Sequence, residues 1–448
     1  MAEAGVSPVN TRRAILHLAW PVIVANFLQT LIGSIDLIMV GGLGAQAVAS
    51  VGLGGQILFF GQSLMIATSV GTLALTARAW GAKDPKEVSR ILWNSVLIGL
   101  GGSLLIMAVA IPLAQPILSA FGAEASVAAG GATYLQIVLF ATPAIFFNFL
   151  AAAALRGMGD TRTPMLVGVL VNVVNVVGNY LLIYGNFGFP RLGIAGSASS
   201  SLTAFIVGAL AYLGILFFRS GPLREGLLGR DTDRTLVRRI GKLAAPAALE
   251  QVIIQTGFMI YVIIVVAFGT TALAAHQIGI SVQSMAFMPG FGFSVAATAL
   301  VGQNLGAKNP PEAERSGWEA VKLAVLVMGL IGLTLWVAAP FIARVYVQDA
   351  KVVELATTWI RIHALSIPAT GMFFTLSGSL RGAGDTRWPL YASSLGIYGV
   401  RIPLSLVLGF FTPLALLGVW MSLVVEYYLR AAIIAGRFRS GVWKAITV

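Results

Sequence analysis

Three acidic residues lie inside long apolar stretches of this sequence. They are Asp36, Glu250 and Glu426, and each is flanked by mostly apolar residues. A charge at the middle of a bilayer costs roughly 2.5–3.5 kcal/mol on insertion scales, so such residues face protein or water and serve ion binding, ligand binding or charge pairing. We therefore take these three carboxylates as the first candidates for chemistry.

Asp36 belongs to a polar stripe on its own predicted helix. The stripe consists of small or polar residues three or four positions apart, namely Asn26, Gln29, Gly33 and Asp36. A later apolar stretch has the same spacing, with Asn172, Asn175 and Asn179. Residues at this spacing share one face of a helix, so we expect the two stripes to face each other, away from lipid.

Asp36 is the residue that we expect to exchange ions. Partial loss of hydration favours the neutral form of a carboxyl group, so Asp36 could hold a proton and release it when a cationic compound or sodium arrives. Pro21 removes one helical hydrogen bond below this site and is the predicted hinge. The alternative is that Asp36 only holds helices together through hydrogen bonds to asparagines.

The remaining charges in apolar stretches have functional and structural interpretations. Glu250 lies one turn after Pro246, and we expect it to take part in coupling or to bind a substrate's charge, with a structural or cavity-wetting role as the alternative. Arg401 and Glu426 are predicted to form an ion pair that lowers the cost of both. His276 is predicted to be a packing residue. No metal-ligand cluster or nucleophile–base pair stands out in the sequence.

The apolar stretches identify the class of protein. Of 448 residues, 57% are apolar and only 10% are charged, whereas a soluble domain carries about 25% charged residues. Each stretch is near the ~20 residues that cross a bilayer. We expect twelve spans, at about 14–40, 50–76, 92–115, 131–154, 164–185, 194–218, 241–267, 274–300, 317–340, 355–379, 390–410 and 416–436.

The basic residues predict an orientation. One set of loops and span ends holds 24 of the 29 Lys and Arg residues, the opposite set holds four, and Arg401 lies inside a span. By the positive-inside rule we expect both termini in the cytoplasm, and we predict a multi-pass protein of a bacterial or archaeal cytoplasmic (inner) membrane. The formal charge of +12 therefore does not indicate a nucleic-acid partner.

Three motifs recur at a fixed offset of 225 residues. Leu18–Pro21 recurs at Leu243–Pro246, Gly81–Pro85 at Gly306–Pro310, and Leu155–Arg162 at Leu380–Arg387. Because six spans is an even number, the copies are parallel repeats, related by an axis along the membrane normal. We predict an N-terminal lobe at 1–218, a cytoplasmic linker at 219–240 and a C-terminal lobe at 241–448. Two such bundles that rock about a cleft are typical of transporters.

With these motifs the chain resembles the multidrug and toxic compound extrusion (MATE) family, and the DinF-like bacterial branch is the assignment we would make within it. The resemblance rests on the span from Pro21 to Asp36, on the two Leu-Arg-Gly-x-Gly-Asp-Thr segments, and on the run from His276 to Gln303. It implies an all-α, V-shaped fold of twelve transmembrane helices in two pseudo-symmetric six-helix lobes. It also implies efflux of cationic amphiphiles in exchange for protons or sodium.

The resemblance also assigns site residues. Asp36 matches the family's first-span aspartate, Asn175 a fifth-span asparagine, and Ser201, weakly, a sixth-span threonine. Asn179 stands where some members carry a second aspartate, which leaves at most a weak Na⁺ site at Asp36, Asn175, Asn179 and Ser201. Glu250 matches a seventh-span glutamate that couples ions in other branches, but the tenth-span acid of those branches has no counterpart between Thr370 and Thr375.

We therefore expect a proton- or sodium-coupled antiporter for cationic or amphiphilic small molecules that works as a monomer, without a cofactor and without enzymatic activity. No ATP-binding segment is recognisable, so the energy would come from an ion gradient or a partner. A flippase of lipid-linked precursors is the first alternative, but it would want several arginines in the cleft, and only Arg401 is expected at mid-membrane. A membrane-embedded enzyme or a channel is the second alternative.

Overall fold

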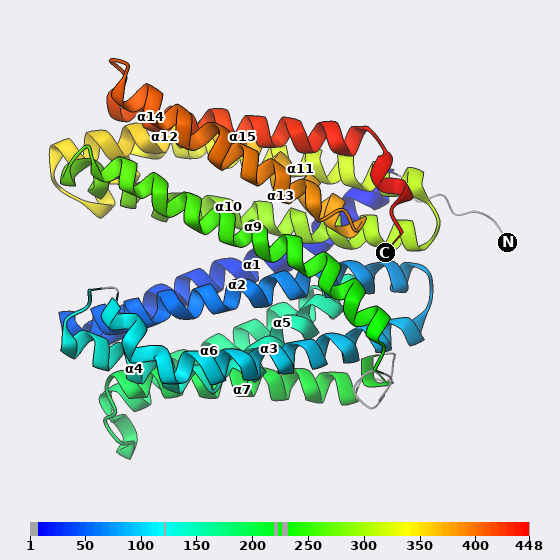
Figure 1. Ribbon diagram of the computed structural model, residues 1–448, viewed down its shortest axis with the longest axis horizontal. Helices are drawn as coiled ribbons and strands as arrows, with labels where there is room; N and C mark the ends of the chain where they lie inside the picture. Colours follow the sequence, from blue (N-terminus) through cyan, green and yellow to red (C-terminus); the bar gives the residue numbers. More distant parts are fainter. Residues whose placement is uncertain (1–7, 121, 219–222, 226–231, 448) are drawn as a thin grey trace. The chain divides into compact units, whose positions relative to one another are not determined.

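The computed structural model describes residues 8–120, 122–218, 223–225 and 232–447, except for the side chains of 8–10, 60 and 64. Almost all of this chain is helical (Figure 1), which confirms the predicted all-α class. The helices are α1 (Pro8–Gly41), α2 (Ala45–Gly81), α3 (Pro85–Ala120), α4 (Ala125–Leu139), α5 (Thr142–Gly157), α6 (Arg162–Tyr184), α7 (Ile194–Phe218), α9 (Arg234–Val266), α10 (Thr270–Gly306), α11 (Pro310–Tyr346), α12 (Ala350–Gly382), α13 (Arg387–Ser394), η2 (Leu395–Arg401), α14 (Ile402–Phe410) and α15 (Ala415–Arg439), with short 3₁₀ turns η1 (Asn186–Gly188) and η3 (Val442–Ala445).

The chain forms two compact units. The first-half unit consists of Val24–Ala244, and the second-half unit consists of Met1–Ile23 together with Ala245–Val448. This division differs at its edges from the lobes and linker expected from the sequence, which remain a prediction. Of the basic residues expected in the linker, Arg219 and Arg230 lie outside the described residues.

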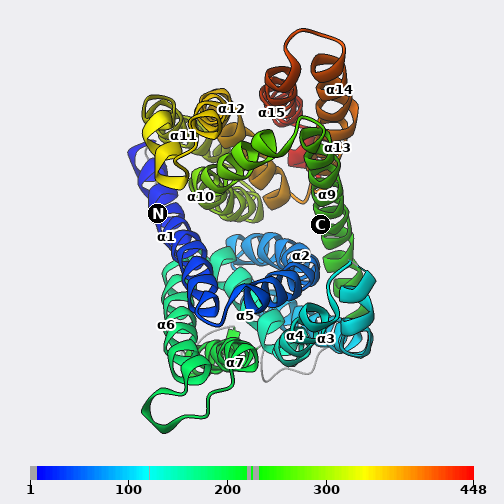
Figure 2. The same cartoon turned by 90° about the vertical axis from the view of Figure 1, so that its left-hand side faces the viewer.

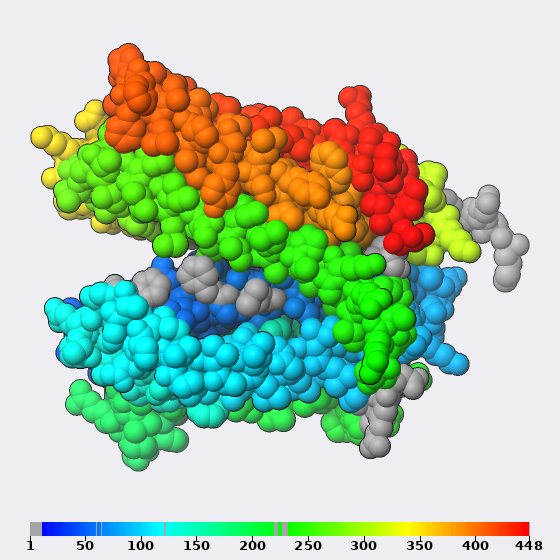
Figure 3. Space-filling model, in the orientation of Figure 1, coloured from blue at the N-terminus to red at the C-terminus, as the bar shows by residue number. Residues whose placement is uncertain are grey.

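In the first-half unit, α2 packs against α3, α4 and α5, and α6 packs against α7. Apolar side chains cover the outside of this unit as well as its interior. On α3, for example, Leu100, Leu104, Leu105 and Val109 are exposed, and this helix forms part of the surface seen in Figure 3. Exposed leucines on consecutive turns are what a helix in contact with lipid requires, since lipid takes the place of water around the bundle.

In the second-half unit, α12 packs along α10, α11 and α15, and α10, α11 and α12 group together in the end view of Figure 2. The interior is rich in large aromatic side chains, including the fully buried Trp359, Phe373, Trp420 and Phe438. Small residues let the helices approach closely. A Cβ atom added at Gly378 of α12 would lie 2.3 Å from the backbone oxygen of Ser294 in α10.

Each of the twelve predicted spans coincides with one helix or one run of consecutive helices. Within the described chain, ten helices are long and apolar enough to cross a membrane, or eleven if the bent pair α4–α5 is one span. The remaining predicted span is α12. Because α12 is enclosed by other helices, it carries small and polar buried residues such as Ser366, Thr370 and Ser377 in place of a lipid-facing surface.

Two predicted spans are less regular than expected. The span at 131–154 is the pair α4–α5, which bends by 53° where Pro143 opens α5; proline suits the first turn of a helix but cannot continue the preceding one. The span at 390–410 contains a π-helical segment, η2, between α13 and α14. Such segments are rare and are frequently found at functional sites.

The two copies of the sequence repeat also share backbone conformations. Lys83 and Lys308 both have φ of 56°, and the glycines Gly159 and Gly384 have φ of 92° and 86°, so the loops of the two copies share their unusual conformations. The helices α2 and α10 also begin and end at positions 225 residues apart. The predicted duplication is therefore present in the fold.

The helices α1 and α9 each belong to both units. The start of α1, through Ile23, packs in the second-half unit, and the start of α9, through Ala244, packs in the first-half unit. Ile15, Leu18 and Ala19 of α1 are buried against α10 and α11. Pro21 and Pro246 lie beside the two points where these helices pass from one unit to the other, so the helical hydrogen-bond ladder is interrupted there.

Matching polar contacts hold the starts of both crossing helices. Glu87 in the first turn of α3 accepts a hydrogen bond from Arg239 of α9 at 2.9 Å. The repeat-related residue, Glu312 in the first turn of α11, accepts a hydrogen bond from Thr11 of α1 at 3.1 Å. The duplication thus preserves the place of the contact although the donors differ.

The close approach of α10 and α12 predicts the effect of a small substitution. Gly378→Ala should destabilise the protein by about 1–3 kcal/mol, because the new methyl group would overlap the backbone of Ser294 and force the helices apart. Gly436→Ala in α15 is the matched control, because a Cβ atom there meets nothing within 4 Å and alanine favours the helix. Thermal unfolding of both variants in detergent tests this, and equal midpoints would contradict the packing described here.

Candidate functional site

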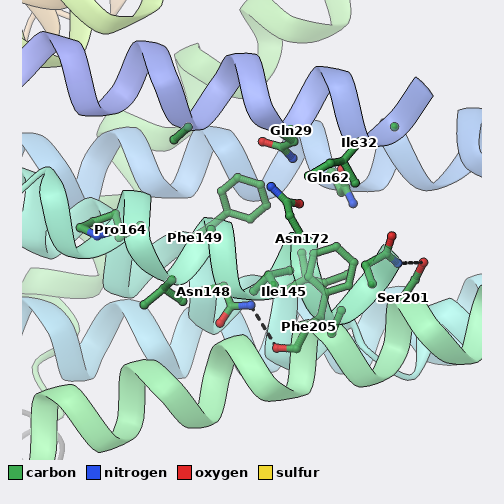
Figure 4. Close-up of a pocket in the computed structure, with 18 of the residues that line it drawn as sticks. Gln29, Ile32, Gln62, Ile145, Asn148, Phe149, Pro164, Asn172, Ser201 and Phe205 are labelled. Atoms are coloured by element: carbon green, nitrogen blue, oxygen red, sulfur yellow. Dashed lines mark hydrogen bonds between the residues drawn. The ribbon is translucent and has the colours of Figure 1, made fainter. Parts of the chain in front are cut away.

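The first-half unit contains a cavity of about 410 Å³. Residues from α1, α2, α4, α5, α6 and α7 line it, and its polar lining includes Asn26, Gln29, Gln62, Asn148 and Asn172. Figure 4 shows Gln29, Gln62 and Asn172 close together between their helices, with Phe149 and Phe205 beside them. A cavity with mixed amide and aromatic walls can accept an organic compound that is partly apolar and partly polar.

The two predicted polar stripes meet in this cavity. All four residues of the α1 stripe line it, as do Asn172 and Asn175 of α6. The third member of the α6 stripe, Asn179, is fully buried and donates a hydrogen bond from Nδ2 to Asp36 Oδ1 at 2.6 Å. The structure therefore brings Asp36, Asn175 and Asn179 together, and Ser201 lies 3.1 Å from the Asn175 amide.

Asp36 is half-buried, and neutral amides surround it. With its nitrogen turned toward Ser201, the Asn175 amide presents its oxygen to the carboxyl group. With the amide rotated, its nitrogen lies 2.7 and 2.9 Å from the two oxygens of Asp36, and its oxygen accepts from Ser201 at 3.1 Å. An amide side chain can serve as donor or acceptor in this way because its two ends differ only in hydrogen-bonding role.

The two orientations of Asn175 suit two states of Asp36. A protonated carboxyl group has an O–H that can donate to the Asn175 oxygen, whereas an ionised carboxylate only accepts and needs the nitrogen. Ser201 can satisfy either orientation, since a hydroxyl both donates and accepts. Hydrogen bonding around Asp36 can thus be satisfied whether this residue holds a proton or a negative charge.

Arg156 also lines this cavity, although the sequence placed it in a loop. It belongs to the last turn of α5, at the start of the repeated Leu-Arg-Gly motif. Tyr134, Gln62 and Asn148 are further lining residues that the sequence analysis did not select. Each of these residues is polar and lies in an apolar stretch, which is a signal that the sequence offers. None belongs to a stripe of polar residues at helical spacing, so the sequence does not show which way its side chain faces.

Glu250 is not open to a cavity of this kind. It is buried, its Oε2 lies 2.6 Å from Nη2 of Arg381, and its Oε1 accepts from Ser393 at 3.0 Å. Arg381 is the repeat-related counterpart of Arg156, while the position equivalent to Glu250 in the first copy is Ala25. These contacts favour the structural alternative for Glu250, because both of its oxygens already have strong donors.

Arg401 and Glu426 lie 2.7 Å apart in the second-half unit. A second arginine, Arg430, contacts the other oxygen of Glu426 at 2.9 Å and donates to Ser393 at 2.7 Å. Arg430 is one of the 24 basic residues that were expected in the cytoplasmic loops and span ends, and that expectation is wrong. It lies within α15 with only 4% of its side chain exposed, because Glu426 one turn earlier offers it a partner.

His276 is buried, and its Nδ1 accepts a hydrogen bond from Trp359 Nε1 at 3.0 Å. Among the described residues no group of three or more His, Cys, Asp or Glu side chains is placed to hold a metal ion. The weak Na⁺ site inferred from the resemblance would depend instead on carboxylate, amide and hydroxyl oxygens around Asp36.

Because only Arg381 pairs with Glu250, alanine substitutions of the repeat-related residues Arg381 and Arg156 should differ in their loss of stability. Arg381→Ala should destabilise the protein by about 3–5 kcal/mol, because it leaves a buried carboxylate without its cation. Arg156→Ala should cost much less, because the first copy has Ala25 in place of Glu250. Denaturation of both variants in the same detergent provides the comparison. Equal losses would show that the Glu250 pair is not what distinguishes the two arginines.

Comparisons with known proteins place this chain in a family. The MatE family model matches residues 21–181 and 246–407. The chain is 31% identical to a probable multidrug resistance protein NorM of Thermotoga maritima over 97% of its length and 93% of that protein. It is 32% identical to a probable multidrug resistance protein NorM of Burkholderia mallei over 98% and 95%.

A solved structure described as the outward-facing conformation of a multidrug resistance MATE family transporter of the MOP superfamily has a similar fold. It matches with a TM-score of 0.89 and 23% identity, over 96% of this chain and 97% of that one. The assignment to a DinF-like branch stays a prediction. The family model covers both copies of the repeat, and on that basis the chain belongs to the multidrug and toxic compound extrusion family of membrane transporters.

Proposed function

We propose that this protein is a secondary active antiporter that exports cationic or amphiphilic organic compounds in exchange for H⁺ or Na⁺. The observation that carries this proposal is a half-buried carboxylate, Asp36, at the wall of a cavity of about 410 Å³, with neutral amides as its hydrogen-bond partners. A negative charge whose hydrogen-bond partners are neutral attracts either a proton or a cationic ligand. The names of the relatives agree with a multidrug substrate range.

The exchange follows from competition for one carboxylate. When Asp36 is ionised, a cationic compound in the cavity is stabilised by its charge, and the apolar part of the compound contacts Phe149 and Phe205. When a proton binds Asp36, that charge is lost and the compound leaves. Because one site holds either ligand, a proton gradient in one direction drives the compound in the other.

A proton fits this site better than sodium. Protonation needs only the rotation of the Asn175 amide, whereas Na⁺ needs several oxygen ligands turned toward one point. Asn179 instead turns its amide nitrogen toward Asp36 at 2.6 Å. We therefore favour H⁺ as the coupling ion, with Na⁺ at Asp36, Asn175, Asn179 and Ser201 as the alternative.

The orientation, location and oligomeric state that we propose are those expected from the sequence. The excess of basic residues on one side supports an orientation with both termini in the cytoplasm, and 23 basic residues remain on that side without the buried Arg430. We propose a bacterial or archaeal cytoplasmic membrane as the location of the protein. We propose a monomer that uses an ion gradient in place of a cofactor and does not act as an enzyme. Pro21, beside the point where α1 passes between the two units, is the proposed hinge.

Asp36→Asn should abolish gradient-driven export in everted vesicles, because an amide cannot exchange a proton for a cation. The protein should remain inserted and folded, since asparagine keeps the size and hydrogen bonding of the site. Separate pH and sodium gradients identify the ion, and we expect only the pH gradient to drive transport in the wild type.

Glu250→Gln is the comparison for Asp36→Asn. It should lower the thermal stability, because Arg381 loses its partner, and it should impair export less than Asp36→Asn at equal protein levels. Undiminished export by Asp36→Asn, or a larger loss in Glu250→Gln, would move the coupling site to the second-half unit.

Pro21→Ala should slow export while leaving the binding of a cationic fluorescent compound unchanged. Alanine restores the backbone N–H that proline lacks, so α1 should become straighter and more resistant to bending, and the thermal midpoint should rise. Transport rates and equilibrium binding measured on the same preparation separate these effects. Wild-type rates in the variant would exclude Pro21 as a hinge.

A further inference from the structure

The second-half unit contains its own cavity, of about 260 Å³. It lies at the repeat-related position of the Asp36 cavity. Its lining residues Phe258, Tyr261, Phe287 and Ile397 are 225 positions after Gly33, Asp36, Gln62 and Asn172, all of which line the first cavity. The duplication has therefore produced two related cavities, and Tyr261 stands in the second where Asp36 stands in the first.

The second cavity has an excess of positive charge. Arg401 and Arg430 line it, and the one carboxylate in contact with both is Glu426. The side chains of Arg401 and Arg430 are 7% and 4% exposed, and that of Glu426 is fully buried. Farther along the same network, Glu250 is matched by Arg381 at 2.6 Å. Two arginines against one carboxylate leave an excess positive charge beside the cavity.

Within the described part of the chain, the buried side-chain atoms that line this cavity and lack a partner are donors. The Nε atoms of Arg401 and Arg430 are buried and make no hydrogen bond. His276, which also lines the cavity, accepts at Nδ1 from Trp359, so its neutral ring carries its proton on Nε2, and that atom is buried without a partner as well. Buried donors without acceptors are costly, and a negatively charged acceptor would satisfy them.

The remaining walls are aromatic, and the backbone beside them is irregular. Phe258, Tyr261, Phe287 and Tyr427 line the cavity, and Arg401 lies over the rings of Tyr261 and Tyr427 at 5.7 and 5.5 Å. Arg401 closes the π-helical segment η2. A segment of this kind inserts an extra residue into a helical turn, and it turns Ile397 and Arg401 of η2 toward the same cavity.

From this geometry we infer that the second-half cavity is a binding site for the carboxylate of an aromatic organic acid or of an aromatic zwitterion. A guanidinium group binds a carboxylate through parallel N–H bonds, and aromatic walls suit a ring attached to that carboxylate. The inference goes beyond the proposed cation exchange at Asp36, because it adds a second ligand class and depends on different residues.

Equilibrium dialysis of the purified full-length protein with radiolabelled benzoate tests this site. Benzoate should bind the wild type, and the neutral benzamide should bind far more weakly. Arg401→Gln should weaken benzoate binding by at least roughly tenfold, as expected for the loss of one charge-assisted hydrogen bond. Arg430 would still pair with Glu426 in this variant, so the fold should survive.

Two variants separate this site from the Asp36 site. Benzyltrimethylammonium, a cation of similar size, should bind the wild type and Arg401→Gln equally, which also shows that the variant is folded. Asp36→Asn should lose this cation and keep benzoate. Loss of benzoate binding in Arg401→Gln with the cation retained supports the inference even if Asp36 proves not to couple ions.

A double variant shows whether Arg401→Gln loses benzoate binding through the change of charge or through disruption of the site. Arg401→Gln with Glu426→Gln removes one charge of each sign, so the excess positive charge on Arg430 remains and benzoate binding should be largely restored. The inference is overturned if the wild type does not bind benzoate, if Arg401→Gln binds it as the wild type does, or if benzamide binds equally well. Competition by inorganic phosphate as strong as that by unlabelled benzoate would overturn the assignment to a carboxylate.

Discussion

A charged side chain inside a bilayer loses its hydration, so it persists only where the protein supplies partners or where its charge is used. The two halves of the protein meet this constraint in different ways. In the second-half unit Arg401, Glu426, Arg430, Ser393, Glu250 and Arg381 form one connected series of contacts. In the first-half unit the hydrogen-bond partners of Asp36 among the described residues are the amides of Asn179 and, once rotated, Asn175. In the second-half unit each buried carboxylate thus has an arginine partner, with one arginine in excess, whereas Asp36 has no arginine among its hydrogen-bond partners.

Duplication followed by divergence explains this difference. The two copies share helix lengths, loop conformations and the positions of their cavities, so the scaffold has been conserved between them. The charges have not been conserved: Asp36 is matched by Tyr261, and Glu250 is matched by Ala25. A transporter built from two like bundles can thus keep one mechanical design while its cavities acquire different affinities.

The helices that cross between the units connect the cavities to the rest of the fold. Asp36 is on α1, whose first turns pack in the second-half unit and whose later turns line the Asp36 cavity. Pro21 lies between these parts. A change in the charge of Asp36 that alters how α1 sits in its cavity would therefore act on a helix that is anchored elsewhere and weakened in its middle, which is the arrangement that a conformational coupling requires.

Much of this could be predicted from the sequence, for identifiable reasons. The duplication and the twelve spans follow from a fixed 225-residue offset and from hydropathy, both of which are local or periodic signals. The approach of Asn175 and Asn179 to Asp36 followed from helical spacing and from the rule that polar stripes avoid lipid. The partners of Glu250 and the burial of Arg430 could not be predicted, because they depend on which side chains α12, α13 and α15 bring together. The bend between α4 and α5 and the π-helical segment were likewise invisible, since neither changes the apolar pattern.

Release of a proton upon cation binding is the most direct test of the central claim that Asp36 holds either a proton or a cation. The purified protein in weakly buffered detergent would be mixed with benzyltrimethylammonium near neutral pH while a pH indicator is followed. The exchange described here predicts acidification that saturates with cation binding in the wild type and is absent in Asp36→Asn. Binding without acidification, or acidification that persists in Asp36→Asn, would contradict it.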